Sequence, residues 1–266
     1  MIRSLPLAAL LAGCVDTSGT LIVRAWAEDT VPDGITTSDG WTVSFEHWYT
    51  AFLDINLDDQ ETADEVWSSG TSLVADWKVT DSPRQLGATD QPAARYDLGF
   101  HIGPPAAGTT NLIGEIDGTV ANEMTTEGWA HLVIGSATNG ADTKTFRLGF
   151  PLDVAYETCE NGYDGSTGVI VKKSDETFAD IYMHADHLLW NELGTEEASL
   201  AFQAWADADA DGAITQADLE GVDLATIGYE AAGIDVANLW EFVRYSVALM
   251  AHLNGEGECL ARGAED

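Results

Sequence analysis

Basic residues are scarce in this chain of 266 residues, which has 11 Lys and Arg against 45 Asp and Glu and a net charge of −34. A surface with that charge repels nucleic acid, so DNA and RNA are not expected as partners. The chain is nevertheless not a disordered acidic tail, because 45% of its residues are hydrophobic and nine are Trp. The length allows one large domain or two modest ones with a buried core.

Long hydrophobic runs are also missing, and no stretch reaches the roughly 18 apolar residues that a membrane helix needs. A short apolar run from Leu5 to Leu11 follows Arg3, and the next residues read L-A-G-C and end at Cys14. This sequence resembles a bacterial lipobox. The resemblance implies that residues 1–13 are a signal peptide, that Cys14 is lipidated, and that the protein is exported and anchored to the envelope, at the outer membrane or cell surface. An ordinary secretory signal with a chance Cys is the alternative.

Only three cysteines are present, and lipidation of Cys14 would leave Cys159 and Cys259. An even pair in an oxidising compartment predicts one disulfide, which would close a loop of about a hundred residues. Two free, buried thiols are the alternative.

Short alternating or apolar segments recur from about Gly19 to Met183, separated by clusters of Gly, Pro, Asp and Asn. Strands are predicted at residues 21–26, 41–45, 96–102, 129–134 and 143–150, with a hairpin at Asn139-Gly140. This pattern indicates a mainly β fold, with an antiparallel β-sandwich or jelly-roll-like domain over residues 14–187. The acidic stretch from Asp54 to Glu65 is interpreted as a solvated loop.

Helical spacing of apolar residues appears in the C-terminal part, residues 188–266. Helices are predicted from Glu196 to Trp205 and from Val236 to Leu253. We expect this helical part to pack on the sandwich.

A calcium-loop pattern lies within the helical part, where residues 207–218 read D-x-D-x-D-G-x-I-x-x-x-D. The pattern resembles the loop of the EF-hand family, in which Gly at the sixth position allows a sharp turn. The resemblance implies that Ca²⁺ takes oxygen ligands from Asp207, Asp209, Asp211, Ala213, Thr215 and Asp218. The closing residue is Asp rather than the usual Glu, and only one loop is visible. We therefore expect structural rather than signalling calcium.

A second metal is suggested by the H-x-D-H segment from His184 to His187. Its members His184, Asp186 and His187 can meet at one zinc or copper ion, with His252 as a further ligand and His101 as another candidate. Two structural alternatives are that Asp186 caps a helix and that a helix dipole stabilises His252. The segment also matches three of the four positions of the H-x-H-x-D-H motif of metallo-β-lactamase-like hydrolases.

The arrangement as a whole is similar to an uncharacterised group of bacterial surface lipoproteins. The shared segments are a T-K-T-F strand, a Y-x-x-C segment, the H-x-D-H segment, a D-x-D-x-D-G loop and a G-E-G-x-C tail, at residues 143–146, 156–159, 184–187, 207–212 and 255–259. A fainter resemblance to periplasmic copper-binding β-sandwich proteins implies copper as one candidate metal.

These patterns favour a lipid-anchored metal-binding protein without enzymatic activity, which binds calcium structurally and zinc or copper at the His/Asp site. The sequence has no G-x-S-x-G elbow, phosphate-binding Gly loop or dinucleotide fingerprint. A metal-dependent hydrolase remains one alternative. A carbohydrate- or protein-binding surface module is another, and its sign would be exposed tryptophans on one face, from among Trp41, Trp48, Trp67 and Trp77.

Overall fold

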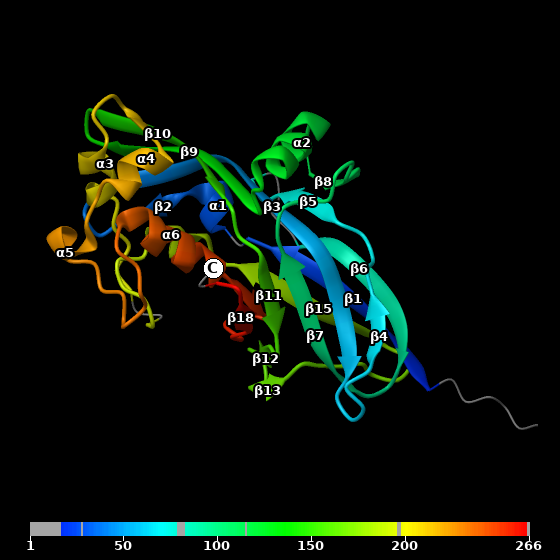
Figure 1. The fold of residues 1–266 in the computed structure, drawn as a ribbon. Helices are drawn as coiled ribbons and strands as arrows, with labels where there is room; N and C mark the ends of the chain where they lie inside the picture. Colours follow the sequence, from blue (N-terminus) through cyan, green and yellow to red (C-terminus); the bar gives the residue numbers. More distant parts are fainter. Residues whose placement is uncertain (1–16, 28, 79–82, 115, 196–197, 265–266) are drawn as a thin grey trace, which may run out of the picture.

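The computed structural model describes residues 17–266 except residues 28, 79–82, 115, 196–197 and 265–266. The lipobox prediction, Cys14 included, lies outside the described residues. The described part is mainly β, and two curved sheets form a sandwich-like fold, which confirms the predicted fold class (Figure 1). None of the described helices is long and apolar enough to cross a membrane.

The smaller sheet contains four strands in the order β17 (Ala251–Leu253), β15 (Glu176–Met183), β1 (Ser18–Trp26) and β6 (Arg84–Pro92). β1 pairs parallel with β15, whereas its pairing with β6 and the pairing of β15 with β17 are antiparallel. Side chains alternate between the two faces of a strand. Leu21, Val23 and Ala25 of β1 are accordingly buried in the core.

The larger sheet has a main path of five strands, which are β10 (Asp142–Phe150), β9 (His131–Asn139), β3 (Thr42–Asp59), β7 (Arg95–Ile102) and β11 (Val154–Glu157). Two short strands from the C-terminal part lengthen this path, β16 (Ala213–Ile214) at the β10 end and β18 (Leu260–Arg262) at the β11 end. Further short strands lie off the path, β2 (Ile35–Thr36), β4 (Glu65–Ser68), β5 (Leu73–Asp76), β8 (Asn111–Ile113) and β14 (Val169–Ile170). β12 (Glu160–Asn161) and β13 (Ser166–Thr167) form a separate two-stranded ribbon.

All five predicted strands are found, and the hairpin at Asn139-Gly140 is confirmed. It joins β9 to β10 with Asn139 opposite Asp142, and Gly140 has a φ of 63°, which favours glycine. The interpretation of residues 54–65 as a loop is wrong for its first half, since β3 continues to Asp59. Ile55 and Leu57 alternate with polar residues and are fully buried there, a period of two that the acidic composition hid.

The helices are short. Four helices gather at one end of the sheets, α3 (Gln203–Ala208), α4 (Gln216–Glu220), α5 (Leu224–Ile227) and α6 (Leu239–Ala248) (Figure 1). The helix α1 (Thr30–Asp33) lies beside β3, and α2 (Gly118–Glu127) lies above β3 in this view. A 3₁₀ helix, η1 (Ala185–Leu189), follows β15.

Both predicted C-terminal helices are shorter than expected, for a tertiary reason. The first begins only at Gln203, because Leu200 forms a β-bridge with Trp190 and the Ala201 N–H donates to the Leu189 carbonyl. The second ends at Ala248, because residues 251–253 pair with β15 as strand β17. The C-terminal part is thus helical and also supplies strands to both sheets.

The predicted disulfide is present between Cys159 and Cys259, which are 100 residues apart. It ties the tail that follows β17 to the chain that follows β11. The backbone N–H of Glu160 also donates to the Glu258 carbonyl at 2.8 Å, so the tail is held beside the β domain at this point.

Candidate metal sites

Strands β15 and β17 bring two histidines together at the edge of the smaller sheet. Tyr182 of β15 lies directly opposite His252 of β17, and His184 follows Tyr182 by two residues. Residues opposite or diagonal to each other in a strand pair share one face, which places both imidazoles on the same side. Their ring centroids are 4.6 Å apart, and both side chains are buried.

The tail after β17 adds a carboxylate to this pair. Asn254 and Gly255 both have positive φ, 54° and 94°, and reverse the chain direction there. Gly257 then lies so close to Glu160 that a Cβ would be 2.0 Å from the Glu160 carbonyl oxygen, so only glycine fits. This turn brings Glu256 Oε2 to 3.7 Å from His184 Nε2 and 4.0 Å from His252 Nδ1.

The ligand atoms of His184, His252 and Glu256 all lie within 4.8 Å of one another. The described part of the chain contains no second group of three His, Cys, Asp or Glu side chains with this property. Two imidazoles and a carboxylate suit zinc and several other transition metals. Three protein ligands would leave a coordination position open, as in catalytic zinc sites.

His187 lies beside this group, although it comes from η1 rather than from a strand. Its ring centroid is 5.4 Å from that of His252 and 5.8 Å from that of His184. The ring also contacts Trp190 in a tilted arrangement, with the centroids 3.5 Å apart. Burial lowers the pKa of His187 well below its ordinary value, and the neighbouring His252 and His184 lower it further. The imidazole is therefore neutral, the form that can bind a metal.

Asp186 does not join the group. Its half-buried carboxylate accepts a hydrogen bond from the Trp190 indole at 3.4 Å. The structure thus brings together His184 and His252, places His187 next to them, and puts Glu256 where the sequence suggested Asp186. Glu256 was missed because its approach depends on the turn at residues 254–257, although the G-E-G-x-C tail was a visible signal.

A cavity of about 570 Å³ adjoins the histidines. His187 and His252 contribute to its wall, together with Trp190, Tyr156 and the Cys259 end of the disulfide. The candidate metal group therefore lies at the edge of a partly apolar cavity.

Burial also lowers the pKa of His252, and the neighbouring His184 lowers it further.

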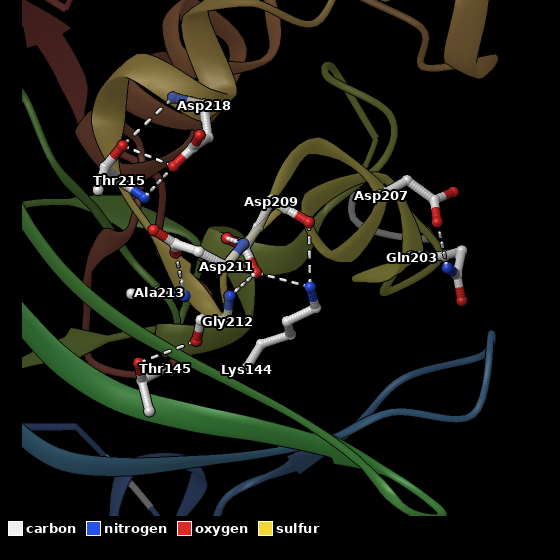
Figure 2. A network of polar contacts seen from close by, with 10 residues as sticks. All are labelled: Lys144, Thr145, Gln203, Asp207, Asp209, Asp211, Gly212, Ala213, Thr215 and Asp218. Atoms are coloured by element: carbon white, nitrogen blue, oxygen red, sulfur yellow. Dashed lines mark hydrogen bonds and ion pairs between the residues drawn. The ribbon is translucent and has the colours of Figure 1, made fainter.

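The predicted calcium loop begins in the last two residues of α3, passes through β16 and ends in the first three residues of α4. Figure 2 shows its carboxylates held by separate partners. Asp207 accepts a hydrogen bond from Gln203 at 2.8 Å, and Asp211 accepts one from the Ala213 N–H at 3.1 Å. Asp218 forms a capping box with Thr215 at the start of α4.

Asp209 is the most heavily bonded of the loop carboxylates. It accepts hydrogen bonds from the Asp211 and Gly212 N–H groups and from the Lys144 ammonium, whose Nζ is 2.6 Å from Asp209 Oδ2. The Lys144 hydrogen bond and the two backbone hydrogen bonds lower the pKa of Asp209 to about 2. Asp209 is thus ionised at every physiological pH.

The loop is attached to the larger sheet through β16. Ala213 and Ile214 pair in parallel with Thr145 and Phe146 of β10, and Thr145 donates two hydrogen bonds to the Gly212 carbonyl (Figure 2). Ile214 is buried. The segment is therefore supported by a strand of the larger sheet.

The four tryptophans suggested for a binding face do not form one. Trp41, Trp48 and Trp77 are buried in the core, and Trp67 is half-buried against it. Comparison of the chain with protein-family models, with curated proteins and with solved structures finds no match. The candidate sites are therefore interpreted from their own geometry and chemistry.

Proposed function

We propose that this protein is an exported, lipid-anchored metal-binding protein that acts without catalysis. It binds one transition metal, zinc or copper, through His184, His252 and Glu256, and it binds calcium structurally in the loop from Asp207 to Asp218. The observation that carries the proposal is the convergence of two buried imidazoles and one carboxylate from separate segments of the chain.

Burial and charge both support a cation at the histidine group. Two imidazoles 4.6 Å apart repel each other when both are protonated, and burial disfavours the protonated form further. A divalent metal binds the neutral rings and is attracted by Glu256 and by a chain whose net charge is −34. His187, whose ring packs against Trp190 beside the group, is a candidate fourth ligand.

Elemental analysis of protein purified without chelator, followed by zinc and copper titration, tests the transition-metal site. We expect one equivalent in the wild-type protein and a loss of binding in His252→Ala and Glu256→Gln. His101→Ala is the matched control, because His101 lies on β7 beside Asp153 and outside the group. Absence of zinc, copper and iron above background, with no binding in titration, would refute the site.

Thermal melting with calcium and with chelator tests the calcium loop. Calcium should raise the melting temperature of the wild-type protein, since a ligand that binds only the folded state stabilises it. The shift should be lost in Asp207→Ala and kept in Glu127→Ala, which removes an equal charge at the end of α2. Equal melting temperatures with calcium and with chelator would exclude a structural role for calcium.

The lipid anchor is supported by the L-A-G-C sequence that ends at Cys14. Mass spectrometry of the mature protein from a bacterial membrane fraction should show a diacylglycerol-modified N-terminal Cys14. Cys14→Ser should be released as a soluble form. A mature chain with an unmodified thiol at Cys14 would contradict the anchor.

A metal-dependent hydrolase is the second candidate, and the cavity of about 570 Å³ at His187 and His252 is the observation that favours it. A hydrolytic metal needs both an open coordination position and space for a substrate. Chromogenic ester and phosphodiester substrates, assayed with the metal-loaded protein and with His252→Ala, test this function. Equal turnover by both proteins would exclude it.

A further inference from the structure

Lys144 of β10 reaches out of the sheet into the calcium loop. Its Nζ lies 2.6 Å from Asp209 Oδ2 and 3.1 Å from the Asp209 backbone carbonyl, so the ammonium interacts twice with one residue (Figure 2). The Asp209 side chain is 1% exposed and that of Lys144 is 18% exposed. The ion pair is therefore largely withdrawn from water, which weakens its screening by solvent.

Asp209 stands at the third position of the loop pattern, one of the positions that supply a calcium ligand. Both of its carboxylate oxygens already accept hydrogen bonds, Oδ1 from the Asp211 N–H and Oδ2 from the Gly212 N–H and Lys144. A calcium ion at Asp209 would lie within a few ångströms of the ammonium, and the two positive charges would repel each other.

We propose that Lys144 is a built-in competitor for calcium: its ammonium holds the Asp209 carboxylate in the metal-free loop, and calcium must displace it in order to bind. The inference rests on the calcium binding proposed above. Two consequences follow from the same ion pair. Lys144 weakens calcium binding, and it also keeps the loop ordered on β10 when calcium is absent.

The β16–β10 pairing allows this exchange without unfolding the loop. Thr145, the residue next to Lys144, donates two hydrogen bonds to the Gly212 carbonyl and keeps the loop backbone on the sheet. The long lysine side chain can therefore leave Asp209 while the loop stays in place. Displacement would move Lys144 from a half-buried position into solvent.

Calcium titration by calorimetry of the wild-type protein, Lys144→Met and Lys173→Met tests the proposal. Lys173 is exposed in the turn before β15, so its variant makes the same change in net charge away from the loop. A hydrogen-bonded ion pair that is largely withdrawn from water contributes about 1–2 kcal/mol, which is roughly a five- to thirtyfold change in an equilibrium constant. We expect Lys144→Met to bind calcium tighter by that factor and Lys173→Met to stay within about twofold of wild type.

Lysine acylation followed by peptide mass spectrometry gives an independent measurement on the wild-type protein. Calcium should increase the acylation rate of Lys144 severalfold and leave that of Lys173 unchanged. If Lys144→Met does not fold, Lys144→Gln removes the charge and keeps a polar group for the same titration.

The outcomes separate the two proposals. Equal calcium affinity in the wild-type protein and Lys144→Met, with no change in Lys144 acylation, overturns the competitor and leaves the calcium site standing. Binding seen only in Lys144→Met supports the competitor in its strongest form. No binding by any of the three proteins overturns the calcium site itself.

Discussion

Removal of the Cys159–Cys259 disulfide should destabilise the protein strongly while leaving the candidate metal group, His184, His252 and Glu256, assembled. The bridge closes a loop of 100 residues that contains β15, η1, α3 to α6, β16 and β17. In the chain-entropy model a crosslink over that length stabilises the folded state by about 4.7 kcal/mol at 25 °C, because it restricts the unfolded chain.

The double variant Cys159→Ala/Cys259→Ala is the perturbation. We expect its free energy of unfolding to fall by about 3–5 kcal/mol, which lies in the upper part of the roughly 2–5 kcal/mol lost when native disulfides are removed. For a protein of this size, each kcal/mol shifts the melting temperature by roughly 2–4 °C, so the expected decrease is about 6–20 °C. The wild-type protein reduced with dithiothreitol should show a similar decrease.

The metal group should survive this change, because other contacts hold the tail. The Asn254 N–H donates to the Asp180 carbonyl at 2.7 Å, and Asn254 Oδ1 accepts a hydrogen bond from the Asp180 N–H at 2.8 Å. β17 also remains paired with β15. Zinc affinity of the double variant below its melting temperature should therefore stay within about threefold of wild type.

Urea denaturation followed by Trp fluorescence measures the stability, and zinc titration measures the site. A double variant whose unfolding free energy lies within about 1 kcal/mol of wild type would refute the reasoning on loop entropy. A large loss of zinc affinity in the folded double variant would show instead that the disulfide, and not the strand pairing, positions Glu256.

Three further predictions concern single residues. Burial lowers the pKa of His131 to about 3, so the unfolded chain binds the proton more readily and stability is lost as pH falls below about 6.5. At pH 5 this residue should lower the free energy of unfolding by about 2 kcal/mol relative to neutral pH. In urea unfolding at both pH values, the free energy of unfolding of His131→Phe should fall by correspondingly less. Gly257→Ala should lower the melting temperature and abolish zinc binding, because its Cβ would collide with the Glu160 carbonyl; a wild-type titration curve would contradict the role of this turn. The zinc affinity of Asp186→Asn should stay within about twofold of wild type, whereas that of Glu256→Gln should fall at least tenfold. The reverse order in titration would show that Asp186, as the sequence predicted, and not Glu256 is the ligand.

Local patterns in the sequence were sufficient for much of the fold. Alternating or apolar segments predicted β1, β3, β7, β9 and β10, and the Asn139-Gly140 pair predicted the hairpin between the last two. These features depend on side-chain periodicity and turn chemistry, which neighbouring residues determine. Cysteine number predicted the disulfide in the same way, because only two cysteines remain after Cys14.

The helix boundaries and the metal group depended on contacts between distant residues. Residues 251–253 continue an apolar helical pattern, yet they form β17 because the edge of β15 offers them backbone partners. Glu256 approaches His184 only because Gly255 and Gly257 allow a tight turn against Glu160. The sequence placed Asp186 near the histidines by proximity along the chain, and the tertiary structure directs its carboxylate to Trp190 instead.

The same division holds for the predicted calcium loop. Its twelve residues, with oxygen donors at fixed spacing and glycine at the turn, are a local pattern that the sequence alone determined. That the loop pairs with β10, and that Lys144 binds Asp209, was decided by the tertiary structure. The physical reason is that the spacing of the oxygen donors is a property of one short segment, whereas the ammonium that pairs with Asp209 comes from a strand 65 residues away in the chain.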